Sequence, residues 1–119
     1  MRVLYVSKTL SVPAYRDKLA ALAEHAELLA VVPRRWGTEI VPPGDANGPP
    51  IHQLHTWFHG HNHFHMYRGI ANVVADARPD IVHIDEEPYS AVTGQLLRIC
   101  RQFSIPTLFF AWQNLQKRL

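Results

Sequence analysis

The chain is poor in several features that mark common protein classes, and each shortage argues against one or more of those classes. It contains one cysteine, Cys100, in 119 residues, which excludes an internal disulfide and suits a reducing compartment. It has no run of about 20 apolar residues, and strand-like residues begin at Arg2 without a signal peptide, so we expect a cytoplasmic protein. Basic residues form no run longer than Arg34-Arg35 or Lys117-Arg118, and the net charge is only +2, so we expect no nucleic-acid partner.

Glycine is missing where a phosphate-binding loop would need it. The segment after the first expected strand, residues 7–11, reads Ser-Lys-Thr-Leu-Ser, which matches neither G-x-G-x-x-G nor the P-loop. The acids and the lysine of a phosphorylation receiver domain are also absent from the ends of the expected strands. A dinucleotide enzyme and a receiver module are therefore not expected.

Short apolar runs alternate with helical patterns along the chain. Strands are expected at residues 2–7, 27–32, 51–55, 80–84 and 106–111. Helices are expected at about residues 13–26 with Ser11 as cap, at 66–77 and at 92–103. Residues 34–50 are rich in proline and glycine and predict a long surface loop. The alternation predicts one α/β domain with a doubly wound parallel sheet of about five strands and helices on both faces.

Three acids, Asp85, Glu86 and Glu87, follow the expected strand at residues 80–84 directly. The carboxyl edge of a parallel sheet is where ligands bind in open α/β folds, so this segment is the leading candidate site. Helix capping alone explains one or two of these acids, but three exceed what a single cap needs.

Further polar and aromatic side chains are expected at the same edge. Tyr89 follows the acids, and Trp112, Gln113 and Asn114 come just after the fifth strand. Carboxylates, amides and aromatic rings together are typical of polyol recognition, so we expect a carbohydrate or polyol ligand. The alternative is that Trp112 belongs to the core and Asn114 caps a helix.

Histidines alternate at positions 59, 61, 63 and 65, and this run has three interpretations. Imidazole is the commonest metal ligand, but Asn62 stands where a metallo-hydrolase H-x-H-x-D-H motif has its acid, so we expect no metal. Packing under a long loop is a second interpretation. We favour binding of a hydroxyl-rich ligand by His61, His63 and His65.

The chain resembles the N-terminal domain of family 4 glycosyltransferases, which have the GT-B fold. The resemblance covers essentially all 119 residues and rests on four segments, at residues 2–7, 62–67, 78–90 and 110–114. It implies one of two Rossmann-like domains that face each other across a cleft. Such enzymes transfer a sugar from a nucleotide donor with retention of configuration, without an obligatory metal or a further cofactor.

The resemblance also implies roles for individual residues. Many relatives have a histidine before the Glu-Pro pair that follows the fourth strand, and this histidine contacts the transferred sugar. Glu86 occupies that position here and becomes the candidate catalytic residue. Relatives also have a glycine pair near the donor phosphates after the first strand, where this chain offers Lys8.

The donor-binding C-terminal domain expected from the resemblance is not part of these 119 residues. We therefore expect an excised or truncated acceptor-side half that is inactive alone, that needs the C-terminal domain as its partner and that self-associates through its uncovered surface. The resemblance leaves open peripheral attachment to the inner face of the membrane. Two alternatives are a non-catalytic binding module on the same fold and a histidine-rich metal-dependent hydrolase.

Overall fold

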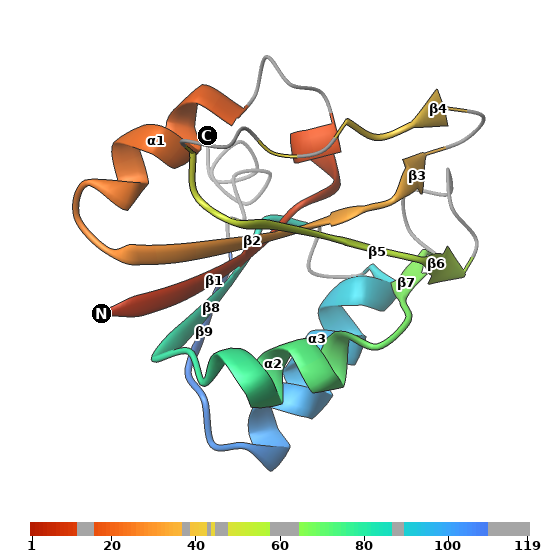
Figure 1. Ribbon diagram of the computed structural model, residues 1–119. Coiled ribbons are helices and arrows are strands. Elements are labelled where there is room, and N and C mark those ends of the chain that lie inside the picture. Colours follow the sequence, from red (N-terminus) through yellow and green to blue (C-terminus); the bar gives the residue numbers. More distant parts are fainter. Residues whose placement is uncertain are drawn as a thin grey trace, which may run out of the picture.

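The computed structural model describes residues 1–11, 16–36, 39–42, 44, 48–57, 65–86 and 90–109 (Figure 1). At its centre is a five-stranded sheet in the order β5-β2-β1-β8-β9, and every neighbouring pair is parallel. The strands are β1 (Arg2–Val6), β2 (Glu27–Pro33), β5 (Ile51–Leu54), β8 (Ile81–Ile84) and β9 (Thr107–Phe109). The expected α/β class and the five-stranded parallel sheet are confirmed.

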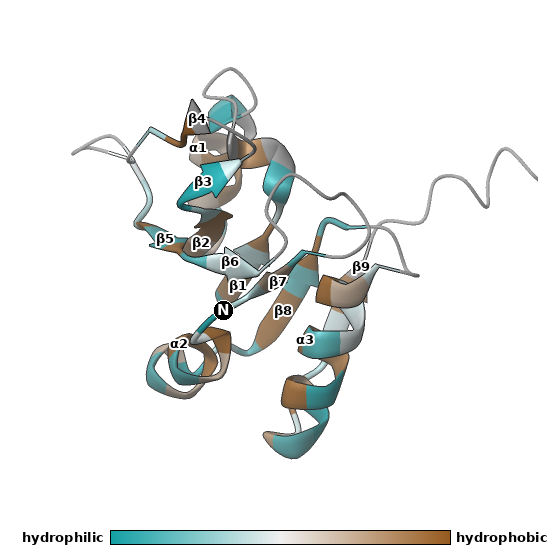
Figure 2. Ribbon diagram, turned by 90° about the vertical axis from the view of Figure 1, so that its right-hand side faces the viewer, coloured by the Kyte–Doolittle hydropathy of each residue, from teal (hydrophilic) through white to brown (hydrophobic). Residues whose placement is uncertain are grey.

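Helices cover both faces of the sheet. Helix α1 (Asp17–Ala23) lies on one face, and α2 (Ile70–Ala77) and α3 (Ala91–Gln102) lie on the other (Figure 1). Successive residues of a strand point to opposite faces, so Leu4 joins the core under α2 and α3 while Tyr5 joins the core under α1. Figure 2 shows the apolar character of β2 and β8, and Val82 and Ile84 of β8 are fully buried.

Cys100 lies in the core at the position that the helical pattern predicts. Its side chain is fully buried among the residues under α2 and α3, and burial raises the pKa of its thiol to about 11. The thiolate is the reactive form of cysteine, so this residue is chemically inert in the folded protein at neutral pH.

Two helix starts differ from the prediction. Residues Lys8–Ser11 form a short 3-10 helix, η1, and α1 begins only at Asp17, so the expected cap at Ser11 is wrong. The second helix begins at Ile70 and not at Met66, because residues 66 and 67 form a short strand and Gly69 turns the chain with φ 76°. The third helix begins at Ala91, one residue before the expected start, and its N-cap is Ser90 and not one of the acids, since the Ser90 side chain accepts a hydrogen bond from the Thr93 N–H at 3.2 Å.

The expectation of an irregular loop over residues 34–50 is wrong in part. Strands β3 (Arg35–Trp36) and β4 (Glu39–Ile40) form a small antiparallel pair, and β6 (Thr56–Trp57) pairs in the same way with β7 (Met66–Tyr67). These strands are too short to show an alternating pattern in the sequence.

None of the helices in the described part of the chain has the length and apolar character needed to span a bilayer.

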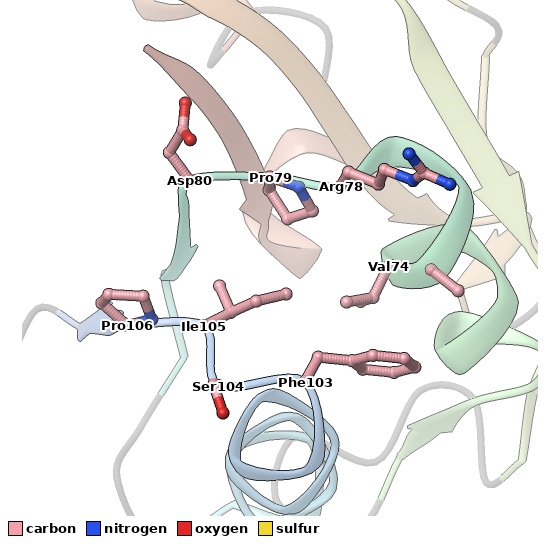
Figure 3. A pocket seen from close by; sticks show the side chains of 9 residues that line it. Val74, Arg78, Pro79, Asp80, Phe103, Ser104, Ile105 and Pro106 are labelled. Carbon is pink, nitrogen blue, oxygen red and sulfur yellow. The ribbon is translucent and has the colours of Figure 1, made fainter.

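A cavity of ≈ 370 Å³ opens at the amino-terminal edge of β8 and β9, and two residues that line it have positive φ (Figure 3). Arg78 follows α2 with φ 48°, and Ser104 follows α3 with φ 56°. Figure 3 shows Val74 and Ile105 pointing into the cavity. Both helices therefore end in a left-handed conformation that normally favours glycine.

Substituting Arg78→Gly or Ser104→Gly should stabilise the protein by roughly 0.5–1 kcal/mol, because glycine adopts positive φ without the Cβ penalty. Urea denaturation followed by far-UV circular dichroism measures the change. Gly69→Ala is the matched control of opposite sign. Its added Cβ would meet nothing within 4 Å, so any loss of stability reports the backbone alone. Destabilisation by either glycine variant would show that contacts of the Arg78 or Ser104 side chain stabilise the protein by more than the positive φ costs.

Candidate functional site

The candidate site lies where the order of the strands reverses. From β1 the chain proceeds outward to β2 and β5, then crosses back to β8 on the other side of β1 and continues to β9. The loops that follow β1 and β8 therefore diverge at the carboxyl edge of the sheet. In open α/β sheets, such a switch point is the usual position of a ligand crevice.

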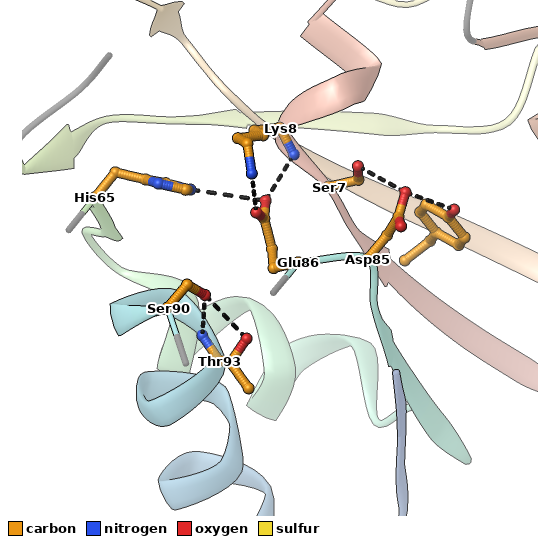
Figure 4. A network of polar contacts seen from close by, with 8 residues as sticks. Ser7, Lys8, His65, Asp85, Glu86, Ser90 and Thr93 are labelled. Carbon is orange, nitrogen blue, oxygen red and sulfur yellow. Dashed lines mark hydrogen bonds and ion pairs between the residues drawn. The ribbon is translucent and has the colours of Figure 1, made fainter. Parts of the chain in front are cut away.

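Lys8 and Glu86 join these two loops (Figure 4). One carboxylate oxygen of Glu86, Oε1, accepts a hydrogen bond from the Lys8 backbone N–H at 2.8 Å, and Oε2 accepts one from Lys8 Nζ at 2.7 Å. The Glu86 side chain is fully buried, whereas that of Lys8 is 19% exposed. A buried carboxylate needs such partners, and here the ammonium group neutralises it while remaining the accessible member of the pair.

His65 lies on the other side of Glu86. Its Nε2 is 3.7 Å from Glu86 Oε1, a distance that makes an ion pair only when the imidazole is protonated. The ring is fully buried and meets Trp36 and Tyr67 edge-on, with centroid distances of 4.9 Å and 5.8 Å. His65 thus combines aromatic packing with a position beside the Glu86 carboxylate.

Tyr67 brings a buried hydroxyl group to the same cluster. Its backbone is held by Gln95, which accepts from the Tyr67 N–H at 3.0 Å and donates to the Tyr67 carbonyl at 2.7 Å. The hydroxyl has no hydrogen-bond partner in the described part of the chain. Burial, and secondarily the charge of Glu86, raises the pKa of Tyr67 well above its ordinary value of 10.0, so the phenol stays neutral.

Asp85 is bound on the β1 side of the site. Its Oδ2 accepts hydrogen bonds from Tyr5 Oη at 3.1 Å and from Ser7 Oγ at 3.0 Å, and its backbone N–H donates to the Val6 carbonyl at 2.8 Å. These contacts hold the carboxyl ends of β1 and β8 in register. Asp85 therefore fixes the position of the end of β8 relative to the end of β1 at this site.

Four of the residues predicted for the site lie together at this edge: Lys8, His65, Asp85 and Glu86. The other predicted residues fall outside the described part of the chain, and their assignment stays a prediction: His61, His63, Glu87, Tyr89, Trp112, Gln113 and Asn114. The sequence pattern does not single out Tyr67, because the helix predicted from Met66 onward includes this residue. A buried tyrosine in a short strand leaves no local signal.

The acids were expected to face a ligand; of the two that the structure describes, Glu86 is buried and Asp85 is partly exposed, and both accept hydrogen bonds from protein groups. Asp85 is held by two hydroxyl groups and Glu86 by Lys8. The described ranges contain no group of three His, Cys, Asp or Glu side chains arranged for a metal ion. His61 and His63 lie outside those ranges, so the absence of a metal site stays a prediction.

No family model, no curated protein and no solved structure matches this chain.

Proposed function

We propose that this chain is the acceptor-side half of a retaining, nucleotide-sugar-dependent glycosyltransferase, with a doubly wound Rossmann-like sheet as one half of a GT-B architecture. The observation that carries the proposal is the Lys8–Glu86 pair at the switch point of the sheet. A ligand crevice is expected there on general grounds, and the pair places a partly exposed ammonium group in it. The sequence resemblance supplies the reaction class.

Glu86 and Lys8 have different roles in this proposal. Glu86 is fully buried and bound by Lys8, so in the described geometry it acts through Lys8 and is a positioning residue. Lys8 is the group that reaches a hydroxyl or phosphate oxygen of a ligand. Its charge also offsets that of Glu86, which lowers the repulsion that an anionic ligand would otherwise meet. Direct contact of Glu86 with the transferred sugar stays a prediction.

A second candidate is a carbohydrate-binding module without catalytic activity. The observation that favours it is that the carboxylates of Asp85 and Glu86 both accept hydrogen bonds from protein side chains. Both candidates bind oligosaccharides. They differ in whether Lys8 and Glu86 contribute to sugar transfer once a donor site is present.

The chain alone is expected to bind oligosaccharides with dissociation constants on the order of 1 mM. It should bind a nucleotide sugar such as UDP-glucose at least about tenfold more weakly, because the proposal places the nucleotide mainly on the other domain. Isothermal titration calorimetry with neutral and acidic trisaccharides and with UDP-glucose measures both. Tighter binding of the nucleotide sugar than of every trisaccharide would overturn the acceptor-side assignment.

A further inference from the structure

A pocket of ≈ 550 Å³ lies beyond the carboxyl end of the edge strand β5, at the same edge of the sheet as Lys8 and Glu86. We call it the Trp57 pocket. Its lining residues are Gln53, Leu54, His55, Trp57, Arg68 and Gly69. Pockets of roughly 300–1,000 Å³ hold small ligands, so a sugar ring fits within this volume.

Trp57 offers an exposed aromatic surface on a fixed backbone. In the β6–β7 pair, Thr56 lies opposite Tyr67 and Trp57 lies opposite Met66. Adjacent residues of a strand point to opposite sides, and Tyr67 is fully buried, so Trp57 points outward and is 49% exposed. The Arg68 N–H donates to the His55 carbonyl at 2.8 Å and extends this antiparallel pairing by one hydrogen bond. The indole is therefore a preformed platform for the C–H face of a sugar.

The polar groups around the indole are cationic or neutral. The Arg68 guanidinium carbon lies over the Trp57 ring, 6.0 Å from its centre, and Arg34 Nη1 lies 3.4 Å from His55 Nε2. No acidic residue is among the six that line the pocket. Arginine binds carboxylates through two parallel hydrogen bonds, so the pocket favours a ligand that combines an apolar ring face with a carboxylate.

We propose that the Trp57 pocket binds a uronic acid residue of an oligosaccharide, with the sugar ring on Trp57 and its carboxylate on Arg68. As a subsite for the acceptor, this inference deepens the proposed function and rests on it. Binding of the acidic sugar itself does not depend on catalysis. The acceptor class would then be an acidic oligosaccharide.

The test compares trigalacturonic acid with the neutral trisaccharide maltotriose by NMR titration of the chain. Trigalacturonic acid should bind about tenfold more tightly, and Trp57→Ala and Arg68→Gln should each weaken it by about tenfold. Trp57→Phe, which keeps an aromatic platform, should retain part of the affinity. The matched controls are Phe103→Ala, at a side chain 46% exposed, and Arg101→Gln, also exposed, both in the segment that ends α3. Neither control should change the affinity more than about twofold.

The outcomes separate this inference from the proposed function. Equal binding of trigalacturonic acid to the parent chain and to Trp57→Ala, or a preference for maltotriose, would overturn the assignment of the pocket. Displacement of trigalacturonic acid by equimolar inorganic phosphate would also overturn it, because a simple anion site would explain the binding. Binding of trigalacturonic acid that Trp57→Ala abolishes, together with tighter binding of UDP-glucose, would support the pocket and reject the acceptor-side assignment.

Discussion

Lys8→Met is expected to lower the free energy of unfolding by about 3 kcal/mol at pH 8, because it leaves the buried Glu86 carboxylate without its cation. The remaining hydrogen bond, from the backbone N–H at position 8, does not supply a charge. His65 lies 3.7 Å away and compensates only by taking up a proton, and the neutral phenol of Tyr67 adds no charge.

Urea denaturation at pH 8 measures this loss. The double variant Lys8→Met/Glu86→Gln should recover at least half of the free energy of unfolding that Lys8→Met loses at pH 8, since it no longer buries a charge. Glu27→Gln is the matched control. It breaks the ion pair of Glu27 with Arg2, whose side chains are 70% and 42% exposed, and should cost less than about 1 kcal/mol. A Lys8→Met loss as small as this control would show that the Lys8–Glu86 pair does not hold the two loops together.

Tyr67→Phe is expected to raise the free energy of unfolding by about 1–2 kcal/mol, because it removes a buried hydroxyl without a partner in the described part of the chain. The gain should grow in alkali. Since the pKa of Tyr67 is raised in the folded state, the unfolded tyrosine loses its proton first, near pH 10, and the parent protein then loses stability as the pH rises. The phenylalanine variant lacks this contribution.

Chemical denaturation of the parent and of Tyr67→Phe between pH 7 and pH 11 measures the difference. Cys100 adds a similar alkaline loss to both proteins, since its pKa is also raised by burial, so the comparison cancels it. Tyr5→Phe serves as the opposite control, because the Tyr5 hydroxyl donates to Asp85 at 3.1 Å and its removal should destabilise. A loss of stability in Tyr67→Phe would mean that the Tyr67 hydroxyl has a favourable contact in solution.

The parallel sheet could be predicted from the sequence because its strands are short runs of mostly apolar residues. Strands β2 and β8 are examples, since the residues of each strand are enough to predict it without knowledge of its pairing partners. The short strand at Met66 could not be predicted in this way. Met66 and Ile70 fit a helical spacing, and only the antiparallel pairing with β6 and the turn at Gly69 separate them.

The position of the candidate site followed from topology, but its internal contacts did not. Placing Lys8, Asp85 and Glu86 at one edge needs only the rule that parallel strands end together. That Glu86 turns inward to Lys8 depends on partners 78 positions apart, for which a single sequence gives no signal. The Trp57 pocket was missed for a similar reason, because the outward direction of Trp57 is set by its pairing with Met66.

The central place of β1 has a consequence for synthesis on the ribosome. This strand emerges first, yet one of its two neighbours is β8, which ends at Ile84. At 5–20 residues per second, the nascent chain carries β1 for roughly 4–16 s before β8 is made. During that interval one edge of β1 has no partner strand, and contacts so distant in sequence also slow folding. The contacts between Lys8 and Glu86 are therefore absent from any nascent chain that has not reached Glu86, and the sheet is complete only once β9 has followed.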